Sequence, residues 1–440
     1  MYLTDELQKK WEKVLNHPDL PEVRDAHKRA VLTVLLENQI NESRKERMIT
    51  EDAPVNSGLT TPSTAKSDTG SKMQGYDPVL ISLLRRALPN LMAFDVCGVQ
   101  PMKAPTGLIF AMKSRYTSQG GAEALGLDEA NTAFTGAGSH AGDADPFAAG
   151  LAAGTGMSTS AGEAKGTGLN SNPPTNSDAF PEMAFSIEKV SVEAKTRALK
   201  AEYSMELAQD LRAVHGLDAE TELANILSAE ILAEINREVI RTIYKSARTG
   251  AQHGVASQGT FNLDVDSNGR WSVEKYKGLM VQIEREANAI AKETRRGRGN
   301  ILICDSDTAS ALSVAGLLDC GSALKDNLSV DDTGNTFVGV LNGRFKVYID
   351  PFAPLGQHFI VAGFKGANQY DAGLFYCPYV PLQMVRAVDQ GSFQPKIGFK
   401  TRYGLVANPF ANTDSSGNVA AALNNGANSY YRKVKVTNLL

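Results

Sequence analysis

The chain has 440 residues, 42% of them hydrophobic and 21% charged, and a formal net charge of -4. This length is enough for two or three domains with sizeable cores, and the mild charge argues against a surface built to wrap nucleic acid. Four scattered cysteines without a Cys-x-x-Cys pair argue against a disulfide framework or a zinc site and indicate reduced thiols. No apolar run reaches membrane-spanning length and the first residues lack a secretion signal, so we expect a soluble protein made inside the cell.

The first 51 residues predict a separable helical piece. Two charged helices are expected, at about 5–16 and 21–46. The second carries an apolar stripe at helical spacing, made of Val23, Ala26, Ala30, Val31, Val34 and Leu35. Because the stripe is narrow, we expect these helices to be solvated or to bind another helix. Residues 52–74 are rich in Pro, Gly, Ser, Thr and Asp and predict a linker of the kind that proteases reach.

Residues 77–194 predict strands around a long loop. A helix is expected at about 77–87, an apolar run over 91–101 becomes strand-like near its end, and strands follow at 108–116 and 183–194. In the last strand Phe185 and Ile187 alternate on one phase and Val190 and Val192 on the other, which predicts a bulge near Glu188.

The intervening loop is poor in large apolar residues, and its stretch 136–168 has too few of them to form a core. Loops of this length are either functional or disordered. Two interpretations stay open: an extended two-stranded arm whose tip is ordered by a neighbouring molecule, and a disordered insertion.

A long helix over 218–246 is the strongest predicted element. Apolar residues recur at every fourth position from Leu223 to Ile243, Ile226 widens the row, and Gly and Pro are absent from the interior. Leu227 and Ile235 are expected in the core. A shorter helix is expected before it, at about 200–215, with Gly216 as its C-cap.

The remainder mixes helices and strands without a regular beta-alpha-beta rhythm, which is typical of the α+β class. Helices are expected at about 273–292 and 306–315. The predicted strands are 301–304, a hairpin over 338–349 that turns at Asn342 and Gly343, 358–364, 373–379, 383–387, 397–406 and 430–436.

No motif predicts catalysis, a cofactor or a metal site. Residues 264–269 open like an EF-hand calcium loop, but Lys275 stands where the bidentate Glu is required, so an Asx-rich turn is expected. The basic, glycine-rich residues 295–299 precede a strand and no helix, which favours a solvated turn or a subunit contact over a phosphate site. The six histidines lack metal-ligand spacing.

Several long runs of this sequence closely resemble the major capsid proteins of T-even-type tailed phages. They lie within about residues 78–410 and are LPNLMAFDVCGVQPM (88–102), PTG (105–107), AQDLRAVHG (208–216), EINREV (234–239), VYID (347–350), YCPYV (376–380) and FKTRYG (399–404). The resemblance implies the α+β fold of tailed-phage and herpesvirus capsid proteins, the Hong Kong 97-type fold.

That fold implies an organisation for the whole chain. Its parts would be a helical propeptide at 1–51, an N-terminal arm at 52–102, an extended loop at 103–190 with a glycine-rich tip, a peripheral domain at 191–246 and 382–412 that includes a spine helix at 218–246, and an axial domain at 247–381 and 413–440. The family's prototype carries a folded insertion domain in the extended loop. Because 136–168 is short and glycine-rich, we do not expect that insertion here as a folded unit.

The resemblance also implies a function and partners. It implies a structural protein, not an enzyme, that assembles as hexamers into an icosahedral or prolate head shell of the virion, in the cytoplasm of a bacterial host. The implied partners are further copies of the chain, an internal scaffold protein, a maturation protease, vertex and portal proteins and outer decoration proteins. Double-stranded DNA would be enclosed without sequence-specific binding, and no membrane is involved. Two alternatives stay open: the pentameric vertex protein of the same phages, and the shell protein of a cellular nanocompartment.

A processing site is expected between Glu51 and Asp52. The charged helices end near Met48 and the linker begins at Asp52, and Met48 to Glu51 resembles the apolar-x-Glu signal cut by T-even-type maturation proteases. Asp52 differs from the small apolar residue of the prototype. The removed helices would hold the precursor on the internal scaffold. The alternative is a permanent N-terminal helical domain.

Overall fold

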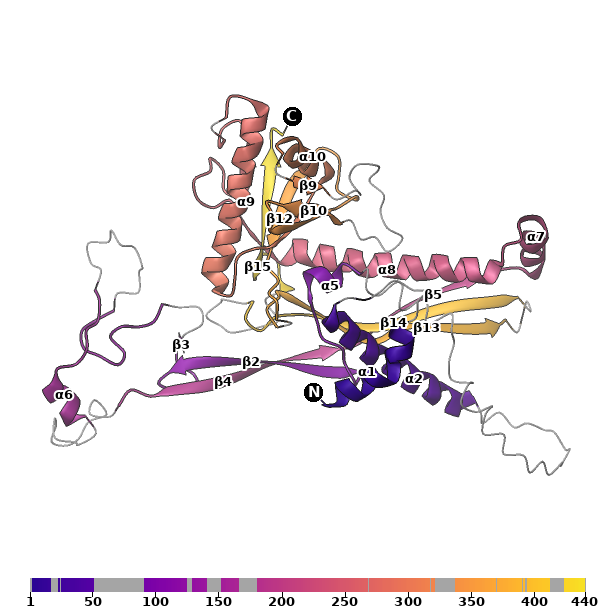
Figure 1. Ribbon diagram of the computed structural model, residues 1–440, viewed down its shortest axis with the longest axis horizontal. Helices are drawn as coiled ribbons and strands as arrows, with labels where there is room; N and C mark the ends of the chain where they lie inside the picture. The colour runs from indigo at the N-terminus through magenta and orange to yellow at the C-terminus, as the bar shows by residue number, and fades with distance from the viewer. Residues whose placement is uncertain are drawn as a thin grey trace. The chain divides into compact units, whose positions relative to one another are not determined.

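The computed structural model describes residues 2–16, 23, 25–50, 91–124, 129–140, 152–165, 180–267, 269–316, 318–320, 337–368, 370–389, 391, 394–411 and 423–439. The predicted linker at 52–74 and helix at 77–87 lie outside them. Helices and separate sheets confirm the α+β class (Figure 1). The chain divides into two compact units, one of Met1–Leu108, Ser191–Ala291 and Arg296–Leu440, the other of Ile109–Val190 and Lys292–Arg295.

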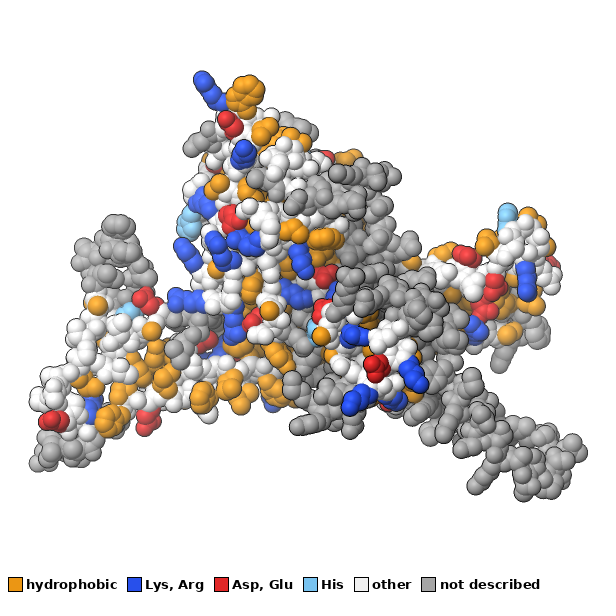
Figure 2. All heavy atoms as spheres, in the orientation of Figure 1, with side chains coloured by type: hydrophobic (Ala, Val, Ile, Leu, Met, Phe, Trp, Pro, Cys, Tyr) orange, Lys and Arg blue, Asp and Glu red, His pale blue; other side chains and the backbone are white. Residues whose placement is uncertain are grey.

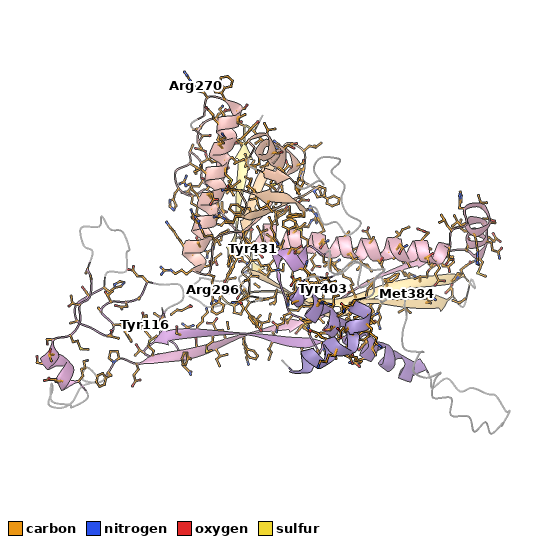
Figure 3. The ribbon with its side chains drawn as sticks, in the orientation of Figure 1. Tyr116, Arg270, Arg296, Met384, Tyr403 and Tyr431 are labelled. Carbon is orange, nitrogen blue, oxygen red and sulfur yellow. The ribbon has the colours of Figure 1, made fainter. Side chains whose placement is uncertain are left out.

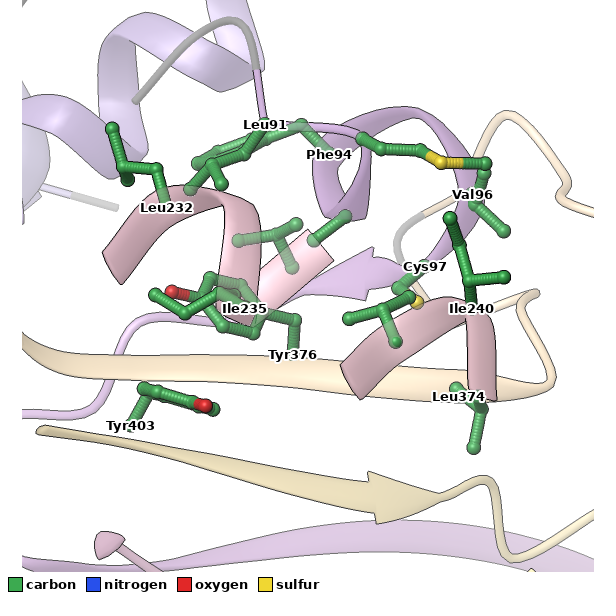
Figure 4. Close-up of a cluster of buried hydrophobic side chains, with 14 of the residues drawn as sticks. Leu91, Phe94, Val96, Cys97, Leu232, Ile235, Ile240, Leu374, Tyr376 and Tyr403 are labelled. Atoms are coloured by element: carbon green, nitrogen blue, oxygen red, sulfur yellow. The ribbon is translucent and has the colours of Figure 1, made fainter. Parts of the chain in front are cut away.

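Helix α8 (Ala219–Ser246) confirms the predicted long helix and lies at the centre of the main core of the first unit. Leu227 is 6% exposed and Ile235 2%, as expected. Ile226 was expected on the same face, and this is wrong, because its side chain is 62% exposed. Successive residues of a helix are about 100° apart, and position 226 falls outside the buried arc that contains position 227. In Figure 4, Leu232 and Ile235 belong to one buried cluster with Leu91, Phe94 and Tyr376.

A four-stranded sheet belongs to the same core. Its order is β1 (Gly98–Val99), β13 (Leu374–Val388), β14 (Pro395–Ala407) and β5 (Lys195–Glu202). Strand β13 joins the two strands predicted at 373–379 and 383–387, and its pairing with β14 shifts register between Pro378 and Gln383. Pro378 and Pro381 have no N–H group to donate, which favours an irregularity at this point.

The predicted helix at 200–215 is correct only from its second turn. Lys200–Glu202 end strand β5, where Lys200 pairs with Gly398 and Glu202 with Lys396 of β14. Helix α7 (Met205–His215) follows, with the Ser204 side chain accepting from the Leu207 N–H at its start. Gly216 ends the helix at φ 68°, the left-handed conformation that favours glycine.

A second sheet has eight strands and its own hydrophobic core. The strand order is β6 (Ala247–Thr249), β15 (Asn428–Thr437), β12 (His358–Gly363), β8 (Ile301–Cys304), β11 (Phe345–Ile349), β10 (Phe337–Leu341) and β9 (Leu318–Cys320), with β7 (Thr260–Asn262) paired to β15. Helices α9 (Ser272–Thr294) and α10 (Ser306–Val314) contribute Leu279, Ile283 and Leu312 to this core. Asn342 and Gly343 turn the β10–β11 hairpin at φ 52° and 66°, which confirms the predicted primed turn.

The second unit is built on a ribbon of strands. Strand β2 (Thr106–Tyr116) pairs with β3 (Glu123–Ala124) and with β4 (Met183–Glu193), so the strand pairing expected of an arm is present in the described residues. The ordering of its tip by a neighbouring molecule stays a prediction. The bulge expected near Glu188 is wrong. Exposure alternates without interruption from Met183 to Glu193, because the two apolar phases are the two faces of one regular strand.

The N-terminal helices α1 (Tyr2–Leu15) and α2 (Ala26–Thr50) pack on each other, and α2 lies against β13 (Figure 1). Most of the predicted apolar stripe is buried: Val23, Val31, Val34 and Leu35 are all under 9% exposed. Between them and α8 lies the short helix α5 (Ala93–Val96), whose buried residues belong to the same core. The stripe is therefore covered by α1 and by the first unit itself, and is not solvated.

Candidate functional site

An exposed apolar surface with regular spacing lies on one face of the β2–β4 ribbon. Phe110 and Met112 of β2 are 60% and 67% exposed, and Phe185 and Ile187 of β4 are 69% and 71% exposed. Figure 2 shows hydrophobic side chains gathered along this part of the chain. We call these four residues the ribbon face. Large exposed apolar patches mark surfaces that bind another molecule.

The other face of the ribbon is buried and holds charged residues among apolar ones, since Ile109, Ala111 and Val192 are all under 5% exposed. Lys113 is only 6% exposed, and its Nζ lies 3.2 Å from Glu188 and 3.6 Å from Glu123. Arg115 pairs with Glu188 at 3.0 Å and donates from Nε to the Ser186 hydroxyl. The ribbon therefore has one buried face, which combines apolar residues with these ion pairs, and one exposed apolar face. The apolar side chains are presented outward on a strand pair that ion pairs hold together.

Beyond the ribbon, the described part of the predicted glycine-rich tip makes local contacts. The Tyr116 and Phe134 rings lie 4.4 Å apart between centroids, and the Tyr116 hydroxyl accepts from the Asn131 N–H (Figure 3). Ala137 and Thr155 exchange two backbone hydrogen bonds. Helix α6 (Thr159–Ala164) buries no residue. These contacts join backbone segments without forming a hydrophobic core, as the composition predicts.

Two polar joints tie helix α8 to the sheets. In the first, Arg197 of β5 pairs with Glu234 at 2.8 Å and Glu238 at 2.5 Å, and the Tyr403 hydroxyl of β14 donates to Glu238. Burial and then the Glu238 hydrogen bond raise the pKa of Tyr403, so its hydroxyl stays protonated and keeps donating. Glu238 and Tyr403 both come from runs that carry the family resemblance.

The second joint lies where β11 ends. Asp350 is 2% exposed and pairs with Arg237 of α8 at 2.7 Å. It also accepts from the Tyr244 hydroxyl at 2.9 Å and the Phe352 N–H at 3.0 Å. Three donors on one carboxylate satisfy its lone pairs in the interior. The joint fixes the eight-stranded sheet to the helix that carries the four-stranded sheet, so it sets the geometry within the first unit.

The motifs considered for ion binding are occupied by protein groups. Lys275 pairs with Asp264 at 2.5 Å, and Asp266 accepts from the Ala256 and Asn262 N–H groups, as expected for a turn. In the basic stretch, Arg296 pairs with Asp371 at 3.0 Å and lies over the Phe410 ring. Both motifs therefore stabilise local structure.

Sequence reasoning missed one cluster with metal-ligating groups, because its members come from distant segments. Oxygen and nitrogen atoms of Asp305, Asp307 and His358 lie within 4.8 Å of one another. Asp305 caps α10 by accepting from the Ser306 N–H at 2.8 Å and lies 3.0 Å from the His358 ring nitrogen. Helix capping and this hydrogen bond account for the arrangement.

The cysteines whose side chains are described are buried free thiols. Burial raises the pKa of Cys97, Cys304 and Cys377 to about 12 in each case. Thiols with such pKa values are poor nucleophiles and poor metal ligands at neutral pH. A surface hollow of about 660 Å³ lies beside Arg197, Glu238 and Tyr403, and these three side chains pair with one another.

Glu51 and Asp52, the predicted processing residues, lie outside the described residues, just after α2. None of the described helices combines the length and apolar character that a membrane span requires.

Comparison with known proteins gives consistent matches. The family model of the major capsid protein Gp23 matches residues 73–436. The chain is 37% identical to the major capsid protein of Vibrio phage KVP40, over 98% of this chain and 100% of that protein. It is 34% identical to the major capsid protein of Enterobacteria phage T4, over 98% of each chain.

Two weaker similarities differ in extent. The capsid vertex protein of Enterobacteria phage T4 is 28% identical over 51% of this chain and 53% of that protein. Among solved structures, a chain of the capsid of Myoviridae phage XM1 is matched over 79% of this chain and 92% of that chain, at 10% identity and a TM-score of 0.39.

Proposed function

We propose, from the premise that this chain belongs to the major capsid protein Gp23 family, that it builds the phage head shell from six-membered rings of its own copies. The chain is a structural protein of the virion capsid and not an enzyme, like the major capsid proteins to which it is similar over nearly its whole length. Its fold is the α+β fold of tailed-phage capsid proteins. The ring size and the contacts that close the ring are the proposal.

The ribbon face is the observation that carries this proposal. Four large apolar side chains, each at least 60% exposed, stand on a strand pair whose other face is fixed by ion pairs. Contacts between unlike surfaces of identical subunits close into rings, and rings tile a shell. We propose that the ribbon face packs on a neighbouring copy, because covering it would remove these side chains from water.

We propose the following assignment of residue ranges to domains. The extended loop over 103–190 contributes the ribbon, residues 191–246 and 382–412 form the peripheral domain, and 247–381 and 413–440 form the axial domain around the ring axis. Helix α8 with strands β5 and β14 supports the peripheral assignment, and the eight-stranded sheet with α9 and α10 supports the axial one, whereas strand β13 crosses the boundary at 381.

The finer partners are also part of the proposal. The shell assembles together with other capsid components, and we propose that these include vertex and portal proteins, outer decoration proteins, an internal scaffold protein and a maturation protease. Assembly would take place in the host cytoplasm, and the finished shell would enclose double-stranded DNA without reading its sequence.

Electron microscopy of the assembling chain tests the ring and the ribbon face together. The unchanged chain is expected to form six-membered rings within sheets, tubes or shells, whereas five-membered rings would indicate a vertex role. The double variant Phe185→Ser with Ile187→Ser is expected to stay folded and fail to assemble. Lys189→Ser, on the same strand and also exposed, removes a charge without a comparable apolar area and is expected to assemble. Normal shells from the double variant would refute the assigned contact.

We further propose that residues 1–51 are removed by cleavage between Glu51 and Asp52. The family resemblance of Met48 to Glu51 and the composition of 52–74 support this. N-terminal sequencing of protein from mature particles is expected to begin at Asp52. A mature chain that still begins at Met1 or Tyr2 would mean that the helices are a permanent part of the shell.

A further inference from the structure

Helices α1 and α2 form a hairpin that is held together by its own contacts. Trp11 of α1 is 1% exposed, and its indole N–H donates to Glu37 of α2 at 3.2 Å. Lys10 pairs with the same Glu37 at 2.7 Å. The Arg29 guanidinium of α2 donates to the Asn16 side chain just after α1. The two helices therefore constitute one element that can move as a body.

The hairpin is seated on the first unit through an apolar face. Val31 and Leu35 of α2 are 1% and 0% exposed. They belong to the same continuous core as Val99 and Leu382. Their i and i+4 spacing places them on one face of the helix, as in the anchors by which an amphipathic helix binds an apolar groove. The seat has the composition of a domain interior and not of a surface contact.

A polar contact fixes the first turns of α2 on the segment before β1. Lys28 pairs with Asp95 at 3.3 Å, and its ammonium lies 5.9 Å from the centre of the Phe94 ring. Both side chains of the ion pair are partly buried, at 20% and 24% side-chain exposure, so the charges are not fully screened by water. This contact sets the position of the helix along its axis.

Further along α2, amide side chains donate hydrogen bonds to backbone carbonyls of the segment before β2 and of strand β13. Asn38 Nδ2 donates to the Met102 carbonyl at 2.7 Å and to the Tyr379 carbonyl at 3.0 Å. Gln39 Nε2 donates to the Leu382 carbonyl at 3.3 Å. Tyr379 and Leu382 lie where β13 shifts register. Buried carbonyls need a donor, and the irregular strand receives it from the hairpin.

We propose that residues 94–102 and 379–382 form a docking site for the α1–α2 hairpin, and that the hairpin stays bound there after the chain is cut. The covalent link adds only the effective concentration of a tethered partner, whereas the buried anchors and the three amide hydrogen bonds remain when it is broken. The docking face is therefore an interaction surface for one defined partner, a helical hairpin of the same sequence.

The biological role of this docking site rests on the proposed function, in which residues 1–51 are removed by cleavage. Cutting the chain and uncovering the face then become two separate events. The face is uncovered only when residues 94–102 and the irregular part of β13 rearrange, since both hold the hairpin. A shell protein with such a site keeps an apolar face covered until the surrounding structure changes.

The test uses the full chain with a site-specific protease sequence inserted between Gly70 and Ser71. Unassembled protein is cut and passed over a gel-filtration column at about 10 µM, a concentration at which a partner of micromolar affinity remains mostly bound. Native mass spectrometry then identifies the species in each peak. We expect the hairpin to co-elute with the rest of the chain. A hairpin that elutes separately would overturn the proposal.

Asn38→Asp and Asn41→Asp are the matched variants. Asp cannot donate to the Met102 and Tyr379 carbonyls, so the affinity of the cut hairpin is expected to fall at least tenfold in the Asn38 variant. Asn41 is exposed on the same helix, and its variant is expected to behave like the unchanged chain. The uncut Asn38→Asp chain, with the hairpin still tethered, controls for folding.

Equal retention of the two variants over the concentration series would overturn the assigned contacts. Because the protease site is artificial, these results do not depend on natural processing. Sequencing of mature particles reports separately on the cleavage, so the two proposals can fail independently.

Discussion

Helix α8 and the β2–β4 ribbon both carry apolar side chains at regular spacing, but those of α8 are buried and those of the ribbon face are exposed. On α8 the row from Leu227 to Ile243 is almost fully buried within the first unit. On the ribbon, Phe185 and Ile187 stand about 70% exposed while Lys113 is buried on the other side. Periodicity shows that a face is apolar, but it does not show whether the same chain or another molecule covers it.

The difference has a physical basis in what each face can reach. A helix of 28 residues lies between a sheet and the segment around α5 and is covered by both. The ribbon is a narrow sheet of β2, β3 and β4 with one buried face, which includes Lys113 and Val192, and one exposed apolar face. Our proposal is that a neighbouring copy covers this apolar side in the assembled shell.

The largest expected effect comes from a comparison of buried charges beside the eight-stranded sheet with the charges of the ribbon. Glu286 and Arg432 form an ion pair at 3.2 Å, and both residues are at most 6% exposed. Glu286 also accepts from the Ala251 N–H at 2.7 Å. Glu286→Gln removes the carboxylate that pairs with this buried guanidinium, so the free energy of unfolding is expected to fall by about 3–5 kcal/mol in chemical denaturation.

The matched variant is Glu188→Gln on the ribbon. Its side chain is 19% exposed, and Lys113 keeps a second carboxylate, Glu123, at 3.6 Å. We expect a loss of about 1 kcal/mol or less. Equal losses at the two sites would mean that the charged face of the ribbon is as enclosed as the core of the eight-stranded sheet.

A smaller effect separates two isoleucines of one helix. Ile235→Ala removes a side chain that is 2% exposed and is expected to cost about 3 kcal/mol of unfolding free energy. Ile226→Ala makes the same change where the side chain is 62% exposed and is expected to cost about 0.5 kcal/mol or less. Similar losses from both variants would show that the isolated chain buries Ile226 in solution.

These isoleucines also show which features of the fold the sequence predicts and which depend on tertiary contacts. A glycine-free row of apolar residues was sufficient to predict α8, and Asn342 with Gly343 was sufficient to predict the hairpin, because both signals are local. The exposure of Ile226 depends on how much of the circumference of α8 the neighbouring elements cover, and the sequence of the helix does not show this. The strand conformation of Lys200 to Glu202 depends on pairing with β14, so a local pattern at this point favoured the wrong element.

The residues of the candidate site were harder to predict from the sequence than the fold. Arg197 and Tyr403 are 206 positions apart, and Arg237 and Asp350 are 113 apart. No spacing rule connects such residues, although several of them lie in the runs that resemble capsid proteins. The ribbon face does have a signal in the sequence: an apolar residue on each phase of β4 predicts one regular strand with both faces covered, and not a bulge.

The smallest expected effect on stability tests most directly whether the ribbon face is exposed in the unassembled chain. In the unassembled chain, Phe185→Ser with Ile187→Ser is expected to change the free energy of unfolding by about 0.5 kcal/mol or less, because both side chains are already exposed to water. Val192→Ser is the control on the same strand. Val192 is 3% exposed, and burying a hydroxyl in its place is expected to cost about 2 kcal/mol or more. If the double variant were instead destabilised as strongly as Val192→Ser, the ribbon face would be covered by the chain itself. It would then be unavailable to a neighbour, and the contrast with α8 would disappear.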